Sequence, residues 1–261
     1  MLRNKYLKYK LKYLKLKDLV GGNPKFLNIA INSFTIDRCL ERLHELFSIE
    51  NFGADIDRLS IGSGNGYFES LYHQKYPSDP QIICIDPDRL SYNSRGLSKA
   101  FIEPSYATVE EYKRANPEKN TLLFINWPDP EIPYDIDSIR SLNPVGFFII
   151  YAMRPHDMTP PMTDDMVPHA GSDGLHHVLN SIDGRDLMIN GSNFNCMTHI
   201  GAKYMNKDEQ SNLKMSMFIN FRKFDELGVS KDIKLLTTRR IFFETITLPF
   251  KNFNEAIKSL R

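Results

Sequence analysis

The segment Leu59-Ser-Ile-Gly62-Ser63-Gly64-Asn65-Gly66 constrains the fold more than any other part of the chain. A short apolar run breaks into three glycines at alternate positions, a helix-like segment follows, and a second apolar run ends at Asp86. Glycines let the backbone adopt positive φ and approach a ligand closely, and the start of a helix offers free N–H groups. A carboxylate at the end of the second strand can accept hydrogen bonds from both hydroxyls of a ribose. This order of features predicts a βαβ nucleotide-binding unit.

The spacing of the glycines indicates which nucleotide is bound. Dinucleotide sites use G-x-G-x-x-G, whereas here the third glycine lies four positions after the first, giving G-x-G-x-G. This pattern resembles motif I of the class I S-adenosylmethionine-dependent methyltransferases, and Asp86 matches the acidic residue of their motif II. The resemblance covers roughly residues 35–223. It implies S-adenosylmethionine as the cofactor, bound by Ser60, Gly62, Ser63, Gly64, Gly66 and Asp86.

The rest of the chain alternates between helical and extended patterns. The expected helices are 35–49, 67–76, 89–98, 108–115, 135–142, 174–181 and 252–260, and the expected strands are 59–61, 82–85, a weak 100–102, 121–125, 145–151, 196–205, 214–222 and 241–248. The fold class is therefore α/β, a doubly wound and mostly parallel sheet of Rossmann-like methyltransferase type, closed by a C-terminal antiparallel hairpin. We expect a basic amphipathic leader over residues 1–23, a methyltransferase-like domain over 24–223 and a strand-helix extension over 224–261.

A second candidate for chemistry follows the expected strand 121–125, in the order Asn126-Trp127-Pro128-Asp129. Ligands of open α/β sheets bind at the carboxyl ends of the strands, so these residues would face the transferable methyl group. The position is similar to motif IV of the amino-group methyltransferases, [DNS]-P-P-[FYW], but here Trp127 precedes Pro128 and Asp129 replaces the second proline. Asn126, Trp127 and Pro128 are the candidate catalytic residues, the alternative being a proline-rich loop in which Trp127 packs.

Ser60 is the second departure from the family pattern, which has Asp or Glu two residues before the first glycine. A serine brings no charge to the ammonium group of the cofactor. Three functions follow: a methyltransferase of unknown acceptor, an inactive methyltransferase-like binding or virion-associated protein, and a nicotinamide-dependent reductase. The glycine spacing and the antiparallel ending disfavour the reductase. Neither a P-loop nor a nucleophile with a nearby base is visible, which argues against phosphoryl and acyl transfer.

The segment 154–174 is rich in histidine, aspartate and proline. It is interpreted as a solvated loop or as a substrate lid in which His156 acts as a general base. Imidazole and carboxylate groups also suit zinc or iron, but the spacing matches no metal motif, so no metal site is predicted.

The first twenty residues carry seven basic side chains against Asp18, a formal charge of +6 in a chain whose net charge is +1. The pattern K-Y-L-K-Y-K-x-K-Y-L-x-L-K…G-G is similar to an N-terminal element of giant DNA viruses of the mimivirus group. The simplest interpretation of this segment is a solvated helix or a disordered tail. The alternatives are packaging into a particle, or weak contact of residues 3–17 with nucleic acid or an anionic membrane. Three scattered cysteines and the lack of an apolar run of roughly 20 residues favour an intracellular protein without a transmembrane segment, in the host cytoplasm or the virion if it is viral.

Overall fold

The computed structural model of the chain describes residues 40, 41, 44, 56–64, 66–86, 101–126, 128, 132–152, 172, 175, 186–204, 213–228 and 242–248. Several expected features lie outside these residues: the leader 1–23, Trp127, the segment 154–174 apart from residue 172, and the helices 89–98 and 252–260. Of the expected helix 35–49, only residues 40, 41 and 44 are described, and they are helical. Of the expected helix 174–181, only residue 175 is described, and it is helical too.

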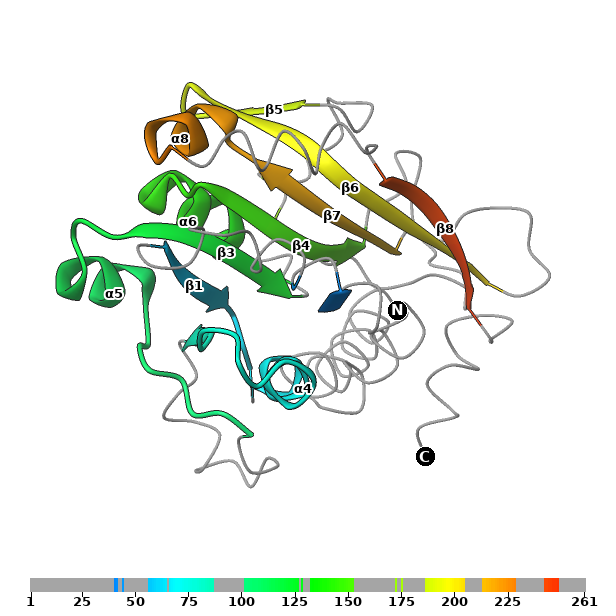
Figure 1. The fold of residues 1–261 in the computed structure, drawn as a ribbon, viewed down its shortest axis with the longest axis horizontal. Helices are drawn as coiled ribbons and strands as arrows, with labels where there is room; N and C mark the ends of the chain where they lie inside the picture. Colours follow the sequence, from blue (N-terminus) through cyan, green and yellow to red (C-terminus); the bar gives the residue numbers. More distant parts are fainter. Residues whose placement is uncertain are drawn as a thin grey trace, which may run out of the picture.

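Eight strands form one sheet in the order β2-β1-β3-β4-β7-β6-β5, with β8 paired to β6 (Figure 1). The strands are β1 (Ile56–Ile61), β2 (Ile83–Ile85), β3 (Asn120–Asn126), β4 (Gly146–Ala152), β5 (Asp186–Ile189), β6 (Ser192–Tyr204), β7 (Leu213–Ile219) and β8 (Phe242–Leu248). The described helices are α4 (Tyr67–Lys75), α5 (Val109–Ala115), α6 (Tyr134–Leu142) and α8 (Phe221–Glu226). No helix within these ranges is long and apolar enough to cross a membrane.

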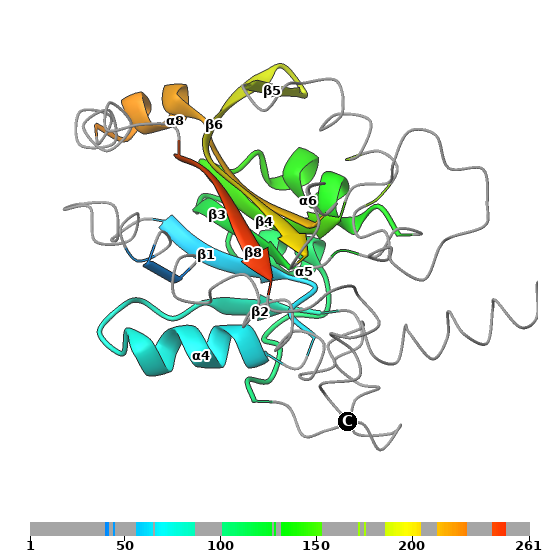
Figure 2. The ribbon, with the colours of Figure 1, turned by 90° about the vertical axis from the view of Figure 1, so that its right-hand side faces the viewer.

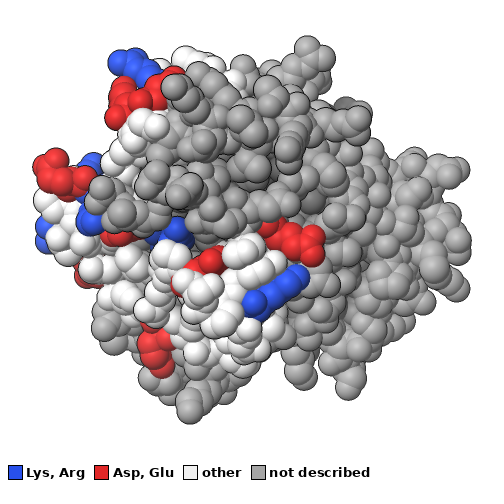
Figure 3. All heavy atoms as spheres, viewed as in Figure 1, with Lys and Arg blue, Asp and Glu red and all other residues white. Residues whose placement is uncertain are grey.

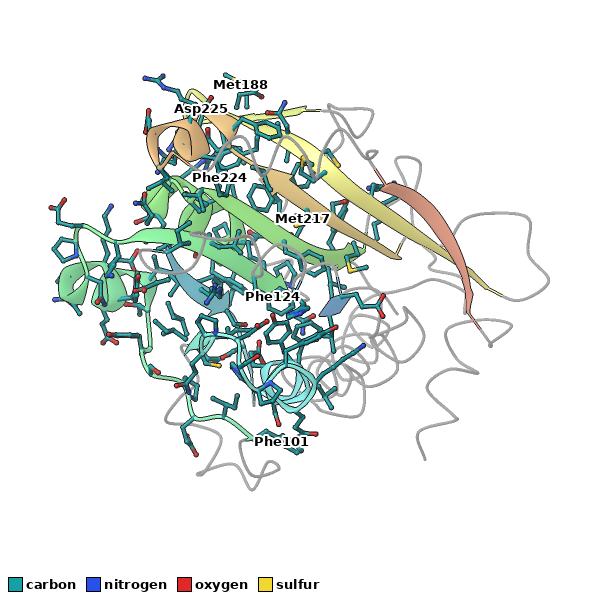
Figure 4. All side chains as sticks on the ribbon, viewed as in Figure 1. Phe101, Phe124, Met188, Met217, Phe224 and Asp225 are labelled. Carbon is teal, nitrogen blue, oxygen red and sulfur yellow. The ribbon has the colours of Figure 1, made fainter. Side chains whose placement is uncertain are left out.

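Strands β2, β1, β3 and β4 are parallel and form the half of the sheet that we call the parallel half. From Thr121 onward every residue of β3 is buried, as expected for a strand covered on both faces. Helix α4 lies against one face (Figure 2). Its Phe68 stacks at 4.4 Å between ring centroids on Phe124, which is labelled in Figure 4. The opposite face packs against α5 and α6. Its core comprises Leu59, Ile61, Leu123, Ile125, Phe147 and Ile149 of the strands and Val109, Tyr112, Ile136 and Ile139 of the helices.

Strands β5, β6 and β7 form the antiparallel half. The later strand β7 lies between β4 and β6 and is antiparallel to both, so an antiparallel hairpin closes a parallel sheet, as expected. Two strands, β5 and β8, pair with the same edge of the long strand β6. The first residues of β6 pair with β5, and its later residues pair in parallel with β8. The fold is therefore a mixed α/β sheet with parallel core strands and antiparallel end strands, and helices on both faces.

Two expected strands are wrong in part. The strand expected over 214–222 ends at Ile219, because the side chain of Asn220 accepts a hydrogen bond from the backbone N–H of Lys223 and starts α8. The weak strand expected over 100–102 is a bend at residues 101 and 102. The chain does pair with β2, but only four residues later, through a single parallel bridge between Tyr106 and Ile85.

The sequence pattern does not predict β5, which forms a hairpin with β6. The turn is Asn190-Gly191, and both residues have positive φ, 49° and 75°. Asn-Gly is the dipeptide that favours a two-residue hairpin turn, because it tolerates this conformation at both positions. The signal was present, but the strand before it has only four residues and begins with an aspartate.

Candidate functional site

The strand order reverses at β1, because β2 pairs with one of its edges and β3 with the other. In open α/β sheets the ligand lies outside the carboxyl ends of the strands at such a switch point. The carboxyl end of β1 leads directly into Gly62, and the carboxyl end of β3 is Asn126. The topology therefore places the glycine turn and the second candidate segment at one edge of the sheet.

The glycine turn is built from three left-handed residues. Gly62, Gly64 and Gly66 have φ values of 67°, 59° and 70°, a region that other L-residues rarely adopt. The N–H groups of Gly62 and Ser63 both donate to the carbonyl of Ile85, at 2.9 and 3.3 Å, which ties the turn to the end of β2. The turn then enters α4 at Gly66, its N-cap residue.

Two of the glycines also allow close approach by neighbouring parts of the chain. A Cβ added at Gly62 would lie 2.7 Å from the hydroxyl of Tyr134, at the start of α6. A Cβ added at Gly66 would lie 2.7 Å from both Cβ and the carbonyl oxygen of Ile102. Such distances are shorter than ordinary van der Waals contact, so larger residues would displace the segments that flank the turn.

Asp86 lies against the turn, as expected from the βαβ pattern. Its Oδ2 accepts a hydrogen bond of 2.7 Å from the backbone N–H of Gly64, and its own N–H donates to the carbonyl of Tyr106 at 3.1 Å. The residue is buried, with 6% of its surface exposed. The glycine turn and the acidic residue after β2 therefore form one unit in the structure.

A second carboxylate lies behind the turn. Glu69, in the first turn of α4, is fully buried and accepts a hydrogen bond from the hydroxyl of Ser60. Burial raises the pKa of Glu69 to about 7, and the negative charge of Asp86 raises it further, whereas the bond from Ser60 opposes this rise. Its other oxygen, Oε2, has no hydrogen-bond partner within the described part of the chain.

Sequence reasoning missed Glu69. A glutamate in the first turn of a helix is ordinary, because carboxylates favour the positive end of the helix dipole. Only the structure shows that Ser60, which brings no charge to the turn, holds a carboxylate there. The position that we expected to lack an acid is thus supplied with one by the next helix.

Cys84 of β2 also lies beside these groups. Burial raises the pKa of its thiol well above the usual range, and the nearby charge of Glu69 adds to this rise. A buried, protonated thiol is a poor nucleophile. Cys84 is therefore a packing residue of the site.

Asn126 lies at the end of β3, and strand alternation places it on the same face as Phe124 and α4. Its side chain is buried with 9% exposed, and within the described residues its Oδ1 has no hydrogen-bond partner. Pro128 is buried as well. Of the three candidate catalytic residues, the structure thus places Asn126 and Pro128 at the carboxyl edge, and Trp127 lies outside the described residues.

The described residues contain no group of three or more His, Cys, Asp or Glu side chains arranged to hold a metal ion. His156 and the other histidines and aspartates of the segment 154–174, which raised this question, are not among them.

Together, the reversal of strand order at β1, the helices on both faces and the glycine turn at the switch point define a mixed α/β protein with a candidate ligand site at the carboxyl edge of its parallel strands. No model of a known protein family matches the chain, and no curated protein does. Among solved structures, a SAM-dependent methyltransferase from Aquifex aeolicus is similar with a TM-score of 0.34 and 11% sequence identity. The match covers 69% of this chain and 88% of that chain.

Proposed function

We propose that the protein is an S-adenosylmethionine-dependent methyltransferase. The observation that carries this proposal is the hydrogen bond from the N–H of Gly64 to Oδ2 of Asp86, which joins the glycine turn to the acid at the end of β2. An adenosyl ligand needs these two elements side by side, because its ribose hydroxyls bind a carboxylate while its chain passes over a close-approach turn.

The proposed ligand has a definite orientation on this edge. The ribose lies beside Asp86, and the methionine part passes over the glycine turn toward β3. The transferable methyl group then faces Asn126, whose amide oxygen is available to orient an acceptor. Methyl transfer needs an in-line nucleophile more than it needs acid–base chemistry, so catalysis is mainly by positioning.

Charge favours this ligand over a nicotinamide dinucleotide. A dinucleotide places its pyrophosphate at the N-terminus of the helix after β1. In this chain the first turn of that helix carries the buried Glu69, close enough to Asp86 for the two charges to influence each other. An ionised Glu69 repels a pyrophosphate at this helix N-terminus but attracts the sulfonium and ammonium groups of S-adenosylmethionine.

Calorimetric titration with S-adenosylhomocysteine tests the proposal. We expect one molecule to bind per chain, and we expect Asp86→Asn to weaken binding by at least tenfold, because the ribose hydroxyls lose a charged acceptor. Asp137→Asn is the matched control, since Asp137 is exposed on α6. Binding of NAD without binding of S-adenosylhomocysteine would replace this proposal with the reductase.

The second candidate is a methyltransferase-like protein that binds the cofactor without transferring its methyl group. The burial of Asn126 favours it, because an acceptor must reach this side chain for transfer. A labelled methyl donor offered with pools of RNA, protein and small amines separates the two functions. An enzyme labels an acceptor and loses turnover, but not cofactor affinity, on Asn126→Ala; a binding protein labels none of the pools.

The surface charge of the described residues does not indicate an acceptor class on the one face shown in Figure 3. On the face seen in Figure 3, the described acidic and basic side chains are interspersed. A nucleic-acid footprint would instead show basic residues gathered on one face. The viral origin and the contacts expected of residues 3–17 stay predictions, because the leader 1–23 on which they rest lies outside the described residues.

A further inference from the structure

Glu69 occupies an unusual place for a carboxylate. It is fully buried, it lies behind the glycine turn through its bond with Ser60, and its Oε2 has no partner among the described residues. Buried charges are ordinarily paired, because desolvation of an unpaired ion costs several kcal/mol. A carboxyl group in this position is therefore poised to respond to any charge that arrives at the turn.

The described groups that act on Glu69 lie on β1 and directly after β2. Ser60 of β1 donates a hydrogen bond, and Asp86 after β2 contributes a negative charge. Arg58, two residues before Ser60 on the same face of β1, is buried, but its charge interacts with Tyr72, Asp79 and Asp57. No described Lys or Arg is among the groups that shift the titration of Glu69. Without a ligand, the environment therefore favours the protonated, neutral form of Glu69.

A second buried atom points to a ligand at the same edge. Oδ1 of Asn126, at the end of the neighbouring strand β3, also has no partner within the described part of the chain. Ser60 and Asn126 lie on the same face of the sheet as α4, by strand alternation. Two buried acceptor oxygens on one side of the turn suit a ligand that carries positive charge.

We propose, building on the cofactor class above, that Glu69 selects a cationic adenosyl ligand and that binding of the cation releases a proton from Glu69 to solvent. The ligand's positive charge favours the ionised carboxylate, so the carboxylate and the ligand stabilise each other. Glu69 acts through the turn and through Ser60, as a specificity-determining and positioning residue. Glu69 of α4 thereby supplies the negative charge that Ser60 does not carry.

The inference predicts how affinity depends on pH. Where Glu69 is protonated in the free protein, release of one proton makes the affinity for S-adenosylmethionine rise about tenfold per pH unit. The rise should level off above the pKa of Glu69 in the free protein, about 7. The affinity for 5′-methylthioadenosine, which has neither a sulfonium nor an ammonium group, should change little over the same range.

Titration calorimetry in buffers of different ionisation enthalpy measures the proton directly. We expect about half a proton to be released per S-adenosylmethionine at pH 7 by the wild-type protein, and none from Glu69 in Glu69→Gln. Titration of the ligand itself cancels in this comparison, because both proteins receive the same ligand. Glu111→Gln is the matched control, since Glu111 is the third residue of α5 as Glu69 is of α4.

Ser60→Ala provides a second variant should Glu69→Gln fail to fold. It removes the hydrogen bond that opposes the rise in the Glu69 pKa, so the pH at which affinity levels off should move upward. An unchanged midpoint in Ser60→Ala, or equal affinities and pH profiles for wild type and Glu69→Gln, overturns the inference and leaves the methyltransferase proposal standing. Failure of the wild-type protein to bind any of S-adenosylmethionine, S-adenosylhomocysteine and 5′-methylthioadenosine overturns both.

Discussion

In the parallel half of the sheet, one group of buried polar residues lies at the carboxyl ends of β1, β2 and β3, around the glycine turn: Ser60, Ser63, Glu69, Asp86 and Asn126. In the antiparallel half, buried polar groups form a chain that starts at β4 and crosses β7 to β6 instead. There, the hydroxyl of Ser216 on β7 lies 2.8 Å from Nδ1 of His199 on β6 and 3.3 Å from the hydroxyl of Tyr151 on β4. In the parallel half, Glu69 Oε2 and Asn126 Oδ1 have no hydrogen-bond partner among the described residues. In the antiparallel half, Tyr151, Ser216 and His199 are hydrogen-bonded to one another.

The two halves also bury ionisable groups of opposite kinds. Burial raises the pKa of the acid Glu69 to about 7, while burial and the nearby charge of Lys214 lower the pKa of the base His199 to about 4. Both groups are therefore neutral over part of the same pH range. Their surroundings differ. Glu69 lies at the switch point of the sheet with one oxygen that has no described hydrogen-bond partner, as expected at a ligand site, whereas His199 is hydrogen-bonded to the fully buried Ser216, as expected of a residue that packs in the core.

The largest expected effect is the difference in stability between two glycine-to-alanine variants, one in each half of the sheet. Gly66→Ala should destabilise the protein by about 4 kcal/mol, because a left-handed alanine costs about 1–2 kcal/mol and overpacking adds about 1–3 kcal/mol. Gly191→Ala, in the β5–β6 turn, should cost only about 1 kcal/mol, since its φ is also positive but nothing lies within 4 Å of an added Cβ. Denaturant unfolding of both variants measures the difference. Equal losses would show that close approach at Gly66 contributes nothing.

A smaller effect is the pH dependence of stability that Glu69 contributes. Its pKa rises from 4.5 to about 7 on folding, so the native state holds the proton more tightly. The stabilisation is complete below pH 4.5 and is lost as the pH rises toward 7, by up to about 3 kcal/mol. Glu69→Gln should abolish this loss in denaturant unfolding without ligand at several pH values. A pH slope that persists unchanged in the variant would place its source elsewhere.

His199 should make the free energy of unfolding depend on pH in the opposite direction. Its pKa falls from 6.5 to about 4 on folding, so stability is present above pH 6.5 and is lost as the pH falls toward 4. The side chain is half-buried, and solvent screening reduces the expected loss to about 1–2 kcal/mol. The two slopes offset each other in the wild-type protein. Unfolding of His199→Asn should therefore show a steeper loss of stability with rising pH, and an unchanged profile contradicts the assignment.

The sequence predicted most of the parallel half because burial on both faces gives continuous apolar runs. Strands 59–61, 121–125 and 145–151 and helices 67–76, 108–115 and 135–142 are confirmed within a few residues. The association of the glycine turn with Asp86 follows from the βαβ pattern, and the structure shows it as a hydrogen bond. That these residues bind a cofactor stays a prediction.

The sequence could not predict features that depend on tertiary contacts. Glu69 is polar, and only its packing against Ser60 distinguishes it from an ordinary first-turn glutamate. The strand expected at 100–102 is replaced by one bridge at Tyr106, because residue 102 packs against Gly66 instead. Strand β7 ends early because Asn220 caps α8. Asn220 follows an apolar run, so its role as a helix cap is not apparent from the sequence.

The smallest effect compares a helix cap in each half. Thr108 is exposed, and its Oγ1 accepts a hydrogen bond of 3.1 Å from the N–H of Glu111, so Thr108→Ala should lower the free energy of unfolding by about 1 kcal/mol. Asn220 caps α8 at 3.4 Å, beyond the usual range for N–H···O bonds, so the lost bond in Asn220→Ala should cost only about 0.5 kcal/mol. Asn220→Asp keeps the acceptor and controls for loss of side-chain volume. Denaturant unfolding of the three variants checks this order. A larger loss in Asn220→Ala that Asn220→Asp restores would mean that the cap of α8 is the stronger one, and that the antiparallel half depends on the helix that ends β7.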